Sequence, residues 1–154
     1  MNLDPAGLVA QILRREPTVV LDVRSAREFA ASHIEGPAVT TLNVPYTRML
    51  GDVEGDDLPR AIARYAEANL AGTIPRGPLI VAVCAKGNTS ALVAQGVRSL
   101  GYDAVSLAGG MQAWGDHYDV RAVVEERDLA VLQVARPARG CLNWIAASCG
   151  AILI

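Results

Sequence analysis

The chain has 154 residues, of which 51% are hydrophobic, and its formal net charge is −2. This length and composition predict one domain with a sizeable core and a short appendage. A net charge so close to zero gives no global electrostatic case for binding nucleic acid or an anionic membrane surface. The three cysteines show no paired spacing, which argues against a disulfide framework and favours a reducing compartment.

No targeting or membrane segment is recognisable in the sequence. The opening residues, Met-Asn-Leu-Asp-Pro, contain neither the basic region nor the apolar region of a signal peptide. No apolar run reaches the ~20 residues that span a bilayer. We therefore expect a soluble cytoplasmic protein that does not insert into a membrane.

The first part of the chain alternates helix and strand signals. Asp4 followed by Pro5 is typical of a helix start, and the β-branched run from Thr18 is typical of a core strand. Ser25 and Glu28 form a capping box, which predicts that a short helix begins there. The predicted elements are a helix over 5–16, a strand over 18–23, a helix over 25–32, a strand over 39–44 and a helical turn over 45–50.

The same alternation continues to about residue 118. Apolar residues at helical spacing follow an acidic loop, and a run of five apolar residues then predicts a strand buried on both faces. The predicted elements are a helix over 57–72, a strand over 79–83, a helix over 90–100, a strand over 104–107 and a last helix from residue 111. Such alternation argues for a parallel sheet with helices on both faces.

Cys84 stands at the carboxyl end of the buried strand, just before a predicted helix. In open α/β sheets, ligands bind at this edge. Unpaired N–H groups at the helix start and the charge of Lys86 should lower the pKa of the thiol from its free value of ~8.5. Gly87 permits the positive φ of a tight turn, and Thr89 or Ser90 can cap the helix. The residues alone leave two readings open: an activated sulfur nucleophile beside an anion-binding loop, or a buried structural cysteine.

Six short segments, in order from about residue 15 to 118, resemble those of a rhodanese-like domain, the sulfurtransferase fold. They are Leu21-Asp22-Val23-Arg24, Glu28-Phe29, His33-Ile34-Glu35-Gly36, Asn43-Val44-Pro45, the loop from Cys84 to Ser90, and Leu107-Ala108-Gly109-Gly110-Met111-Gln112-Ala113-Trp114. The resemblance implies a three-layer α/β/α fold with a central parallel sheet over 1–119. It also implies that Cys84 is the catalytic residue, which accepts a sulfane sulfur as a persulfide and passes it to a thiol or to cyanide.

By the same resemblance, the substrate lies in a cradle formed by Ala85, Lys86, Gly87, Asn88, Thr89 and Ser90. The family often has an arginine directly after the cysteine, and Ala85 replaces it here. One anion contact is therefore missing, and a small persulfide becomes as plausible a donor as thiosulfate. No cofactor is implied. No metal is expected either, because the chain has no Cys-x-x-Cys and no close histidine pair.

For several other residues, most of them in the segments that resemble the family, the sequence predicts a less specific role. Asp22 and Arg24 either touch the active site or, as we favour, form a structural ion pair that fixes the loops near the strand end. His33 is expected to be a structural turn residue, His117 a surface residue, and Trp114 a core anchor.

Two other functions stay open. Some cysteine phosphatases and arsenate reductases share the fold, but they need a longer loop and an arginine that forks onto the oxyanion. Here Ser90 occupies the sixth position after Cys84, and the nearest downstream arginine is Arg98. The domain could instead be a regulatory or docking module without catalytic activity; the presence of Cys84 favours an active domain.

Residues 120–154 extend beyond the usual single rhodanese-like domain. Segments 129–135 and 141–147 are predicted strands, and the stretch resembles the start of a metallo-β-lactamase-fold domain. The metal-binding signature of that fold, His-x-His-x-Asp-His, is absent from the chain. Open apolar strands are adhesive edges, so we expect this extension to promote self-association.

Overall fold

The computed structural model describes residues 1–51, 58–117, 120–124 and 130–134, with residues 116–117 and the last two ranges as backbone only. The strands are β1 (Asn2–Leu3), β2 (Thr18–Asp22), β3 (Val39–Asn43), β4 (Leu79–Val83), β5 (Ala104–Leu107), β6 (Val120–Val124) and β7 (Ala130–Val134). The helices are α1 (Pro5–Leu13), α2 (Ala26–Ala31), α3 (Tyr46–Leu50), α4 (Leu58–Asn69), α5 (Asn88–Ser99) and α6 (Gly110–His117).

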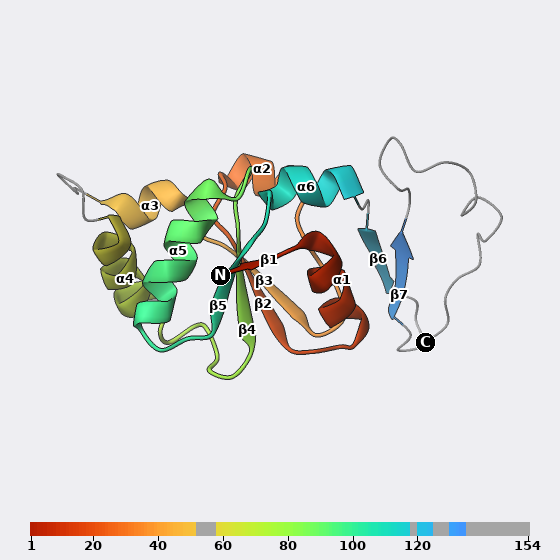
Figure 1. The fold of residues 1–154 in the computed structure, drawn as a ribbon, viewed down its shortest axis with the longest axis horizontal. Helices are drawn as coiled ribbons and strands as arrows, with labels where there is room; N and C mark the ends of the chain where they lie inside the picture. The colour runs from red at the N-terminus through yellow and green to blue at the C-terminus, as the bar shows by residue number, and fades with distance from the viewer. Residues whose placement is uncertain (52–57, 118–119, 125–129, 135–154) are drawn as a thin grey trace.

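Five strands form one parallel sheet in the order β1-β5-β4-β2-β3. Figure 1 shows α4 and α5 on one side of this sheet and α1 and α6 on the other. The predicted three-layer α/β/α fold with a central parallel sheet is therefore confirmed. The strand β1 was not predicted, because two residues carry no periodicity; it exists through its pairing with β5, where Asn2 lies opposite Ser106.

Local signals at the two N-terminal helices behave as the sequence predicts. The Asp4 carboxylate accepts a hydrogen bond of 2.7 Å from the backbone N–H of Gly7 and so caps α1, with Pro5 in its first turn. Ser25 and Glu28 form the predicted capping box at the start of α2. Each cap satisfies backbone donors that a helix start leaves without an intrahelical partner.

The central strand β4 divides its side chains between two apolar cores. Ile80, Ala82 and Cys84 belong to the core that α4 and α5 cover, whereas Val81 and Val83 belong to the core beneath α1 and α6. This follows from the two-residue period of a strand, which sends successive side chains to opposite faces. Burial on both faces explains the unbroken apolar run, and it assigns Cys84 to the face of α5.

Asp22 and Arg24 form a buried ion pair where β2 ends. The Arg24 guanidinium donates to both Asp22 carboxylate oxygens, at 2.6 Å for Nη2 to Oδ2, and to the carbonyl oxygen of Ser32. The two side chains are 8% and 1% exposed. The Asn43 side-chain amide donates to the carbonyl oxygens of both residues. The pair thus fixes the segments that follow β2 and β3, as the preferred sequence interpretation predicted.

The C-terminal extension is described only at β6 and β7, which pair antiparallel with Val120 opposite Val134. The strand predicted over 129–135 corresponds to β7, while β6 was not predicted. The strand expected over 141–147 lies outside the described residues, and so does most of the stretch that resembles a metallo-β-lactamase start. No helix within the described ranges combines the length and the apolarity needed to cross a membrane.

Substituting Asp22 with asparagine should destabilise the fold strongly. The change leaves the Arg24 guanidinium buried without its counter-charge, and breaking one partner of a buried pair costs about 3 kcal/mol or more. Chemical denaturation of Asp22→Asn measures the loss. The matched control is Glu16→Gln, which removes the solvent-exposed partner of Arg14 and should leave the free energy of unfolding unchanged. Equal effects of the two substitutions would contradict this account.

Candidate active site

Cys84 lies directly after β4 and is 7% exposed. Its Sγ accepts a hydrogen bond of 3.0 Å from the backbone N–H of Gly87 and one of 3.3 Å from the Ser90 hydroxyl. The first donor lies in the turn that connects β4 to α5, and the second lies in the first turn of α5. The sulfur is therefore held by donors and not only packed as an apolar group.

Gly87 makes this tight connection possible. Its φ of 92° is in the left-handed region, which residues with a Cβ rarely adopt. A Cβ at this position would also lie 3.0 Å from the backbone nitrogen of Gly109. Gly87, only three residues after Cys84, can therefore place its own backbone N–H within hydrogen-bond distance of the Cys84 sulfur.

The start of α5 differs from the sequence prediction. The helix begins at Asn88 instead of Ser90, and its N-cap is Gly87, which provides no side-chain cap. The prediction that Thr89 or Ser90 caps the helix is therefore wrong. The Ser90 hydroxyl instead contacts Cys84 Sγ and the Gly87 carbonyl oxygen.

The turn is braced from outside by the first residues of α6. The backbone N–H of Met111 donates to the carbonyl oxygen of Cys84 at 2.8 Å, and that of Gln112 donates to Ala85 at 3.0 Å. Free N–H groups at a helix start are natural partners for such carbonyl oxygens. Because these two carbonyl oxygens are bound by α6, the turn is held in the conformation that offers the Gly87 N–H to the sulfur.

The pKa of Cys84 lies below the usual value of 9.0, as the net result of effects that oppose one another. Burial raises the pKa, since it penalises the charged thiolate. The Ser90 hydroxyl and the backbone N–H groups of Ser90, Lys86 and Gly87 lower it, and together they exceed the effect of burial. The Lys86 ammonium is not among these causes, and the Lys86 side chain is exposed, so the contribution of this charge to the thiol stays a prediction.

A second serine belongs to the site and was missed in the sequence. Ser106, on β5, is 1% exposed, and its Oγ lies 2.8 Å from Ser90 Oγ. It also donates to the carbonyl oxygen of Gly87 at 3.3 Å. The signal in the sequence was a single hydroxyl residue within a short apolar strand, which is weak without knowledge of its neighbour across the sheet.

The remaining predicted cradle residues are less buried than Cys84 and Ser90. Ala85, Lys86 and Asn88 are exposed, and Thr89 is half-buried. Asp22 lies opposite Val83 in the register of β2 and β4, whose side chains belong to the face opposite that of Cys84. The Asp22–Arg24 pair therefore supports the strand ends from the other face of the sheet.

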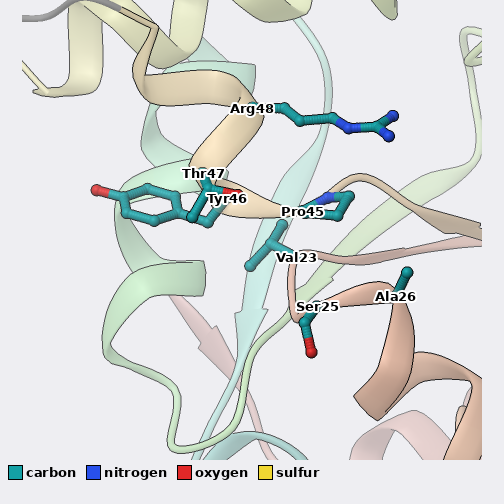
Figure 2. A pocket seen from close by; sticks show the side chains of 7 residues that line it. All are labelled: Val23, Ser25, Ala26, Pro45, Tyr46, Thr47 and Arg48. Carbon is teal, nitrogen blue, oxygen red and sulfur yellow. The ribbon is translucent and has the colours of Figure 1, made fainter.

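A hollow of about 310 Å³ lies at the same carboxyl edge of the sheet, beyond the ends of β2 and β3. In Figure 2, Tyr46 and Arg48 extend from α3 in opposite directions, with Pro45 and Val23 between them. Val23, at the wall of the hollow, donates its backbone N–H to the Val83 carbonyl oxygen and packs in the same core as Cys84. Its lining residues are Val23, Ser25, Ala26, Pro45, Tyr46, Thr47 and Arg48.

Within the residues that the structure describes, no group of three or more His, Cys, Asp or Glu side chains is placed to hold a metal ion.

Comparison with known proteins decides the family. The profile of the rhodanese-like domain matches residues 5–117. The chain belongs to the rhodanese-like domain family. No curated protein sequence matches it.

Solved rhodanese-like structures share the fold. A rhodanese-like domain protein from Staphylococcus aureus is 22% identical, with a TM-score of 0.53 over 88% of this chain and 98% of that one. A rhodanese-related protein from Thermoplasma volcanium is 23% identical, with a TM-score of 0.52 over 73% and 88%. The human single-domain sulfurtransferase TSTD1 is 25% identical, with a TM-score of 0.50 over 73% and 93%.

Substituting Gly110 with alanine should disrupt the brace around the turn. Gly110 has a φ of 59°, and a Cβ there would collide with the Cys84 carbonyl oxygen and the Gly87 nitrogen. Left-handed strain and overpacking against backbone together cost on the order of 3 kcal/mol. Denaturant titration checks this, with Gly115→Ala as the control, since Gly115 lies on the same helix and faces open space. Unchanged stability in Gly110→Ala would refute the brace.

Removing the Ser90 hydroxyl should make Cys84 less reactive. Only the thiolate is alkylated, so a lowered pKa moves the onset of reaction with iodoacetamide to lower pH, and Ser90→Ala moves it back to higher pH. A hydrogen bond to a charged group contributes about 1.5 kcal/mol, roughly tenfold in thiolate fraction. The greater nucleophilicity of the more basic thiolate reduces the loss of rate to about threefold below the midpoint.

The pH profile of alkylation, followed by intact mass with Cys141 and Cys149 replaced by serine, provides the measurement. The control is Ser99→Ala, which removes a hydroxyl that donates to the Gly96 carbonyl oxygen within α5. A profile of Ser90→Ala that coincides with that of the parent would show that this hydroxyl does not stabilise the thiolate.

Proposed function

We propose that the protein is a sulfurtransferase that carries a sulfane sulfur as a persulfide on Cys84. One observation supports this above the others: Cys84 Sγ sits at the end of β4 with the Gly87 N–H at 3.0 Å and the Ser90 hydroxyl at 3.3 Å. Donors fixed around a sulfur stabilise its anionic form before any substrate arrives. The lowered pKa of Cys84 agrees with such a role.

The first half-reaction loads the sulfur. The Cys84 thiolate attacks the outer sulfur of the donor, and a new S–S bond forms while the donor's own bond to that sulfur breaks. The leaving group departs with the electron pair of the broken bond, as sulfite from thiosulfate or as a thiolate from a small persulfide. No net oxidation of the protein is required, because the sulfur arrives at the oxidation level of the persulfide.

The second half-reaction unloads it. A nucleophilic acceptor, either a thiolate or cyanide, attacks the outer sulfur of the Cys84 persulfide. The bond to Sγ breaks and its electron pair returns to Cys84 as the thiolate. The same hydrogen bonds that stabilise the resting thiolate therefore stabilise the leaving group of this step, so the turn assists both halves of the cycle.

The charges around the site favour a small anionic substrate. Ala85 provides no cation where many relatives of the family have one, but Lys86 and Arg48 are both exposed near this edge. The hollow beside α3 offers space for the part of the donor or acceptor that does not react. Thiosulfate and small persulfides both fit this description, and the similarity to the human sulfurtransferase TSTD1 supports the reaction class.

A cysteine phosphatase or arsenate reductase fits less well. The first arginine after the turn, Arg98, lies in the last turn of α5, where it donates to the Ala104 carbonyl oxygen at 2.7 Å. That guanidinium is therefore committed at the end of α5 far from Cys84, whereas oxyanion chemistry needs it at the sulfur. Turnover of an aryl phosphate that disappears in Cys84→Ser would reverse this preference. A docking module without activity remains the second candidate, because the exposed edge of the turn could also bind a partner.

Loading should be visible by intact mass spectrometry. The protein is treated with thiosulfate and, in parallel, with a small persulfide, and we expect a gain of a single sulfur that cyanide removes. The control Cys84→Ser should gain no sulfur, because the serine hydroxyl is too weak a nucleophile to attack the donor. The donor that loads faster identifies the substrate class. Failure of both donors on folded protein would favour the docking module.

A further inference from the structure

The hydroxyls of Ser90 and Ser106 form a buried pair that reaches the sulfur. Ser90 is 0% exposed and Ser106 is 1% exposed. Ser106 lies on the face of β5 that also carries Ala104, which packs in the same core as Cys84. A buried hydroxyl without a partner is costly, so the two groups must satisfy each other and their neighbours.

The pair has two protons and several acceptors within reach. Ser90 Oγ lies 3.3 Å from Cys84 Sγ, 3.2 Å from the Gly87 carbonyl oxygen and 2.8 Å from Ser106 Oγ. Ser106 Oγ lies 3.3 Å from the same carbonyl oxygen. Each hydroxyl has one proton to donate and can accept as well. If the Ser90 hydroxyl donates its hydrogen bond to Ser106 or to the Gly87 carbonyl oxygen, it cannot donate to the sulfur.

We propose that Ser106 is a positioning residue that directs the Ser90 hydroxyl toward Cys84 Sγ when the sulfur is an anion. In the thiolate state Ser106 donates to Ser90 Oγ, and Ser90 donates to the sulfur. In the thiol state the direction reverses: the S–H donates to Ser90, Ser90 donates to Ser106, and Ser106 donates to the Gly87 carbonyl oxygen. Both arrangements keep all heavy atoms in place.

Because the hydrogen bonds reverse direction, the dipoles of the two hydroxyl groups reorient when the sulfur gains or loses its negative charge. Rotation of two hydroxyl groups replaces the movement of a side chain or of water, so the stabilisation is available at the moment when charge appears on Sγ. Hydrogen bonds in series polarise one another, which makes the Ser90 donor stronger when Ser106 donates to it. The pair does not conduct a proton to solvent, because it ends at a buried residue.

The surrounding charges do not duplicate this effect. Lys86 is exposed, and the Asp22–Arg24 pair is internally neutralised on the opposite face of the sheet. Within α6, residues 110–115 carry no charged side chain. The titratable side chains that pack in the core of Cys84 are Tyr46, Tyr65 and Tyr102. The charged groups near this edge of the sheet are Asp22, Arg24, Arg48 and Lys86, and Arg98 lies in the last turn of α5. None of them is altered by the substitutions that test the pair.

The test is the pH profile of Cys84 alkylation by iodoacetamide, in the full chain with Cys141 and Cys149 replaced by serine. In Ser106→Ala the profile should move to higher pH, with the rate below the midpoint reduced about twofold. Ser106→Thr keeps the hydroxyl and should return the profile toward the parent. Ser99→Ala, which removes a hydroxyl bound to a backbone carbonyl at the far end of α5, should not move it.

A double-mutant cycle separates positioning from a structural role. If Ser106 acts through Ser90, then Ser106→Ala has no further effect on the profile in a Ser90→Ala background. An equal shift in both backgrounds would overturn the proposal, since Ser106 would then act on the turn itself through Gly87. An unmoved profile in folded Ser106→Ala would overturn it as well.

This proposal deepens the proposed function but can fail separately from it. Alkylation needs no sulfur donor, so the profile reports the thiolate even if Cys84 never carries a persulfide. If Ser106→Ala folds poorly, the thermal midpoint falls, and Ser106→Thr against the parent still tests the pair. A shift in Ser106→Thr as large as that expected for the loss of Ser90 would contradict the retained-hydroxyl prediction.

Discussion

The site depends on one constraint, which is that the four-residue connection from β4 to α5 turns its N–H groups toward the Cys84 sulfur. Two features enforce it. Gly87 adopts a φ of 92°, and the N–H groups of Met111 and Gln112 bind the carbonyl oxygens of Cys84 and Ala85 from outside. The last helix of the domain, α6, therefore completes a turn that lies much earlier in the chain. Gly110 allows the two backbones to approach this closely, because a Cβ there would collide with the Cys84 carbonyl oxygen.

A buried thiolate would ordinarily be unfavourable, and the structure shows how that cost is offset. Burial alone raises the pKa of Cys84, yet hydrogen bonds from one hydroxyl and three backbone N–H groups lower it by more. Backbone donors are suited to this task because they carry no net charge that would need its own counter-ion. Lys86 of the same turn is exposed to solvent.

The sequence predicted the architecture well and the site in part. Buried strands, capping signals and the alternation of elements are local properties, so β2, β4, α1 and α2 were predictable, and so was the position of Cys84. The role of Ser106, the start of α5 at Asn88 and the brace from α6 depend on pairings between residues far apart in the chain. The residue type of Lys86 is visible in the sequence, whereas its exposure is seen only in the fold.

The most direct test of the account is to measure the transfer of sulfur from Cys84 to cyanide. Protein loaded with thiosulfate is freed of donor, mixed with cyanide, and assayed for thiocyanate, in parallel with Cys84→Ser. If the turn holds a transferable sulfur on Cys84, the wild-type chain releases up to a single equivalent of thiocyanate and the variant releases none. Release of equal amounts by both proteins, or of none by a folded wild-type chain that has carried sulfur, would contradict the account.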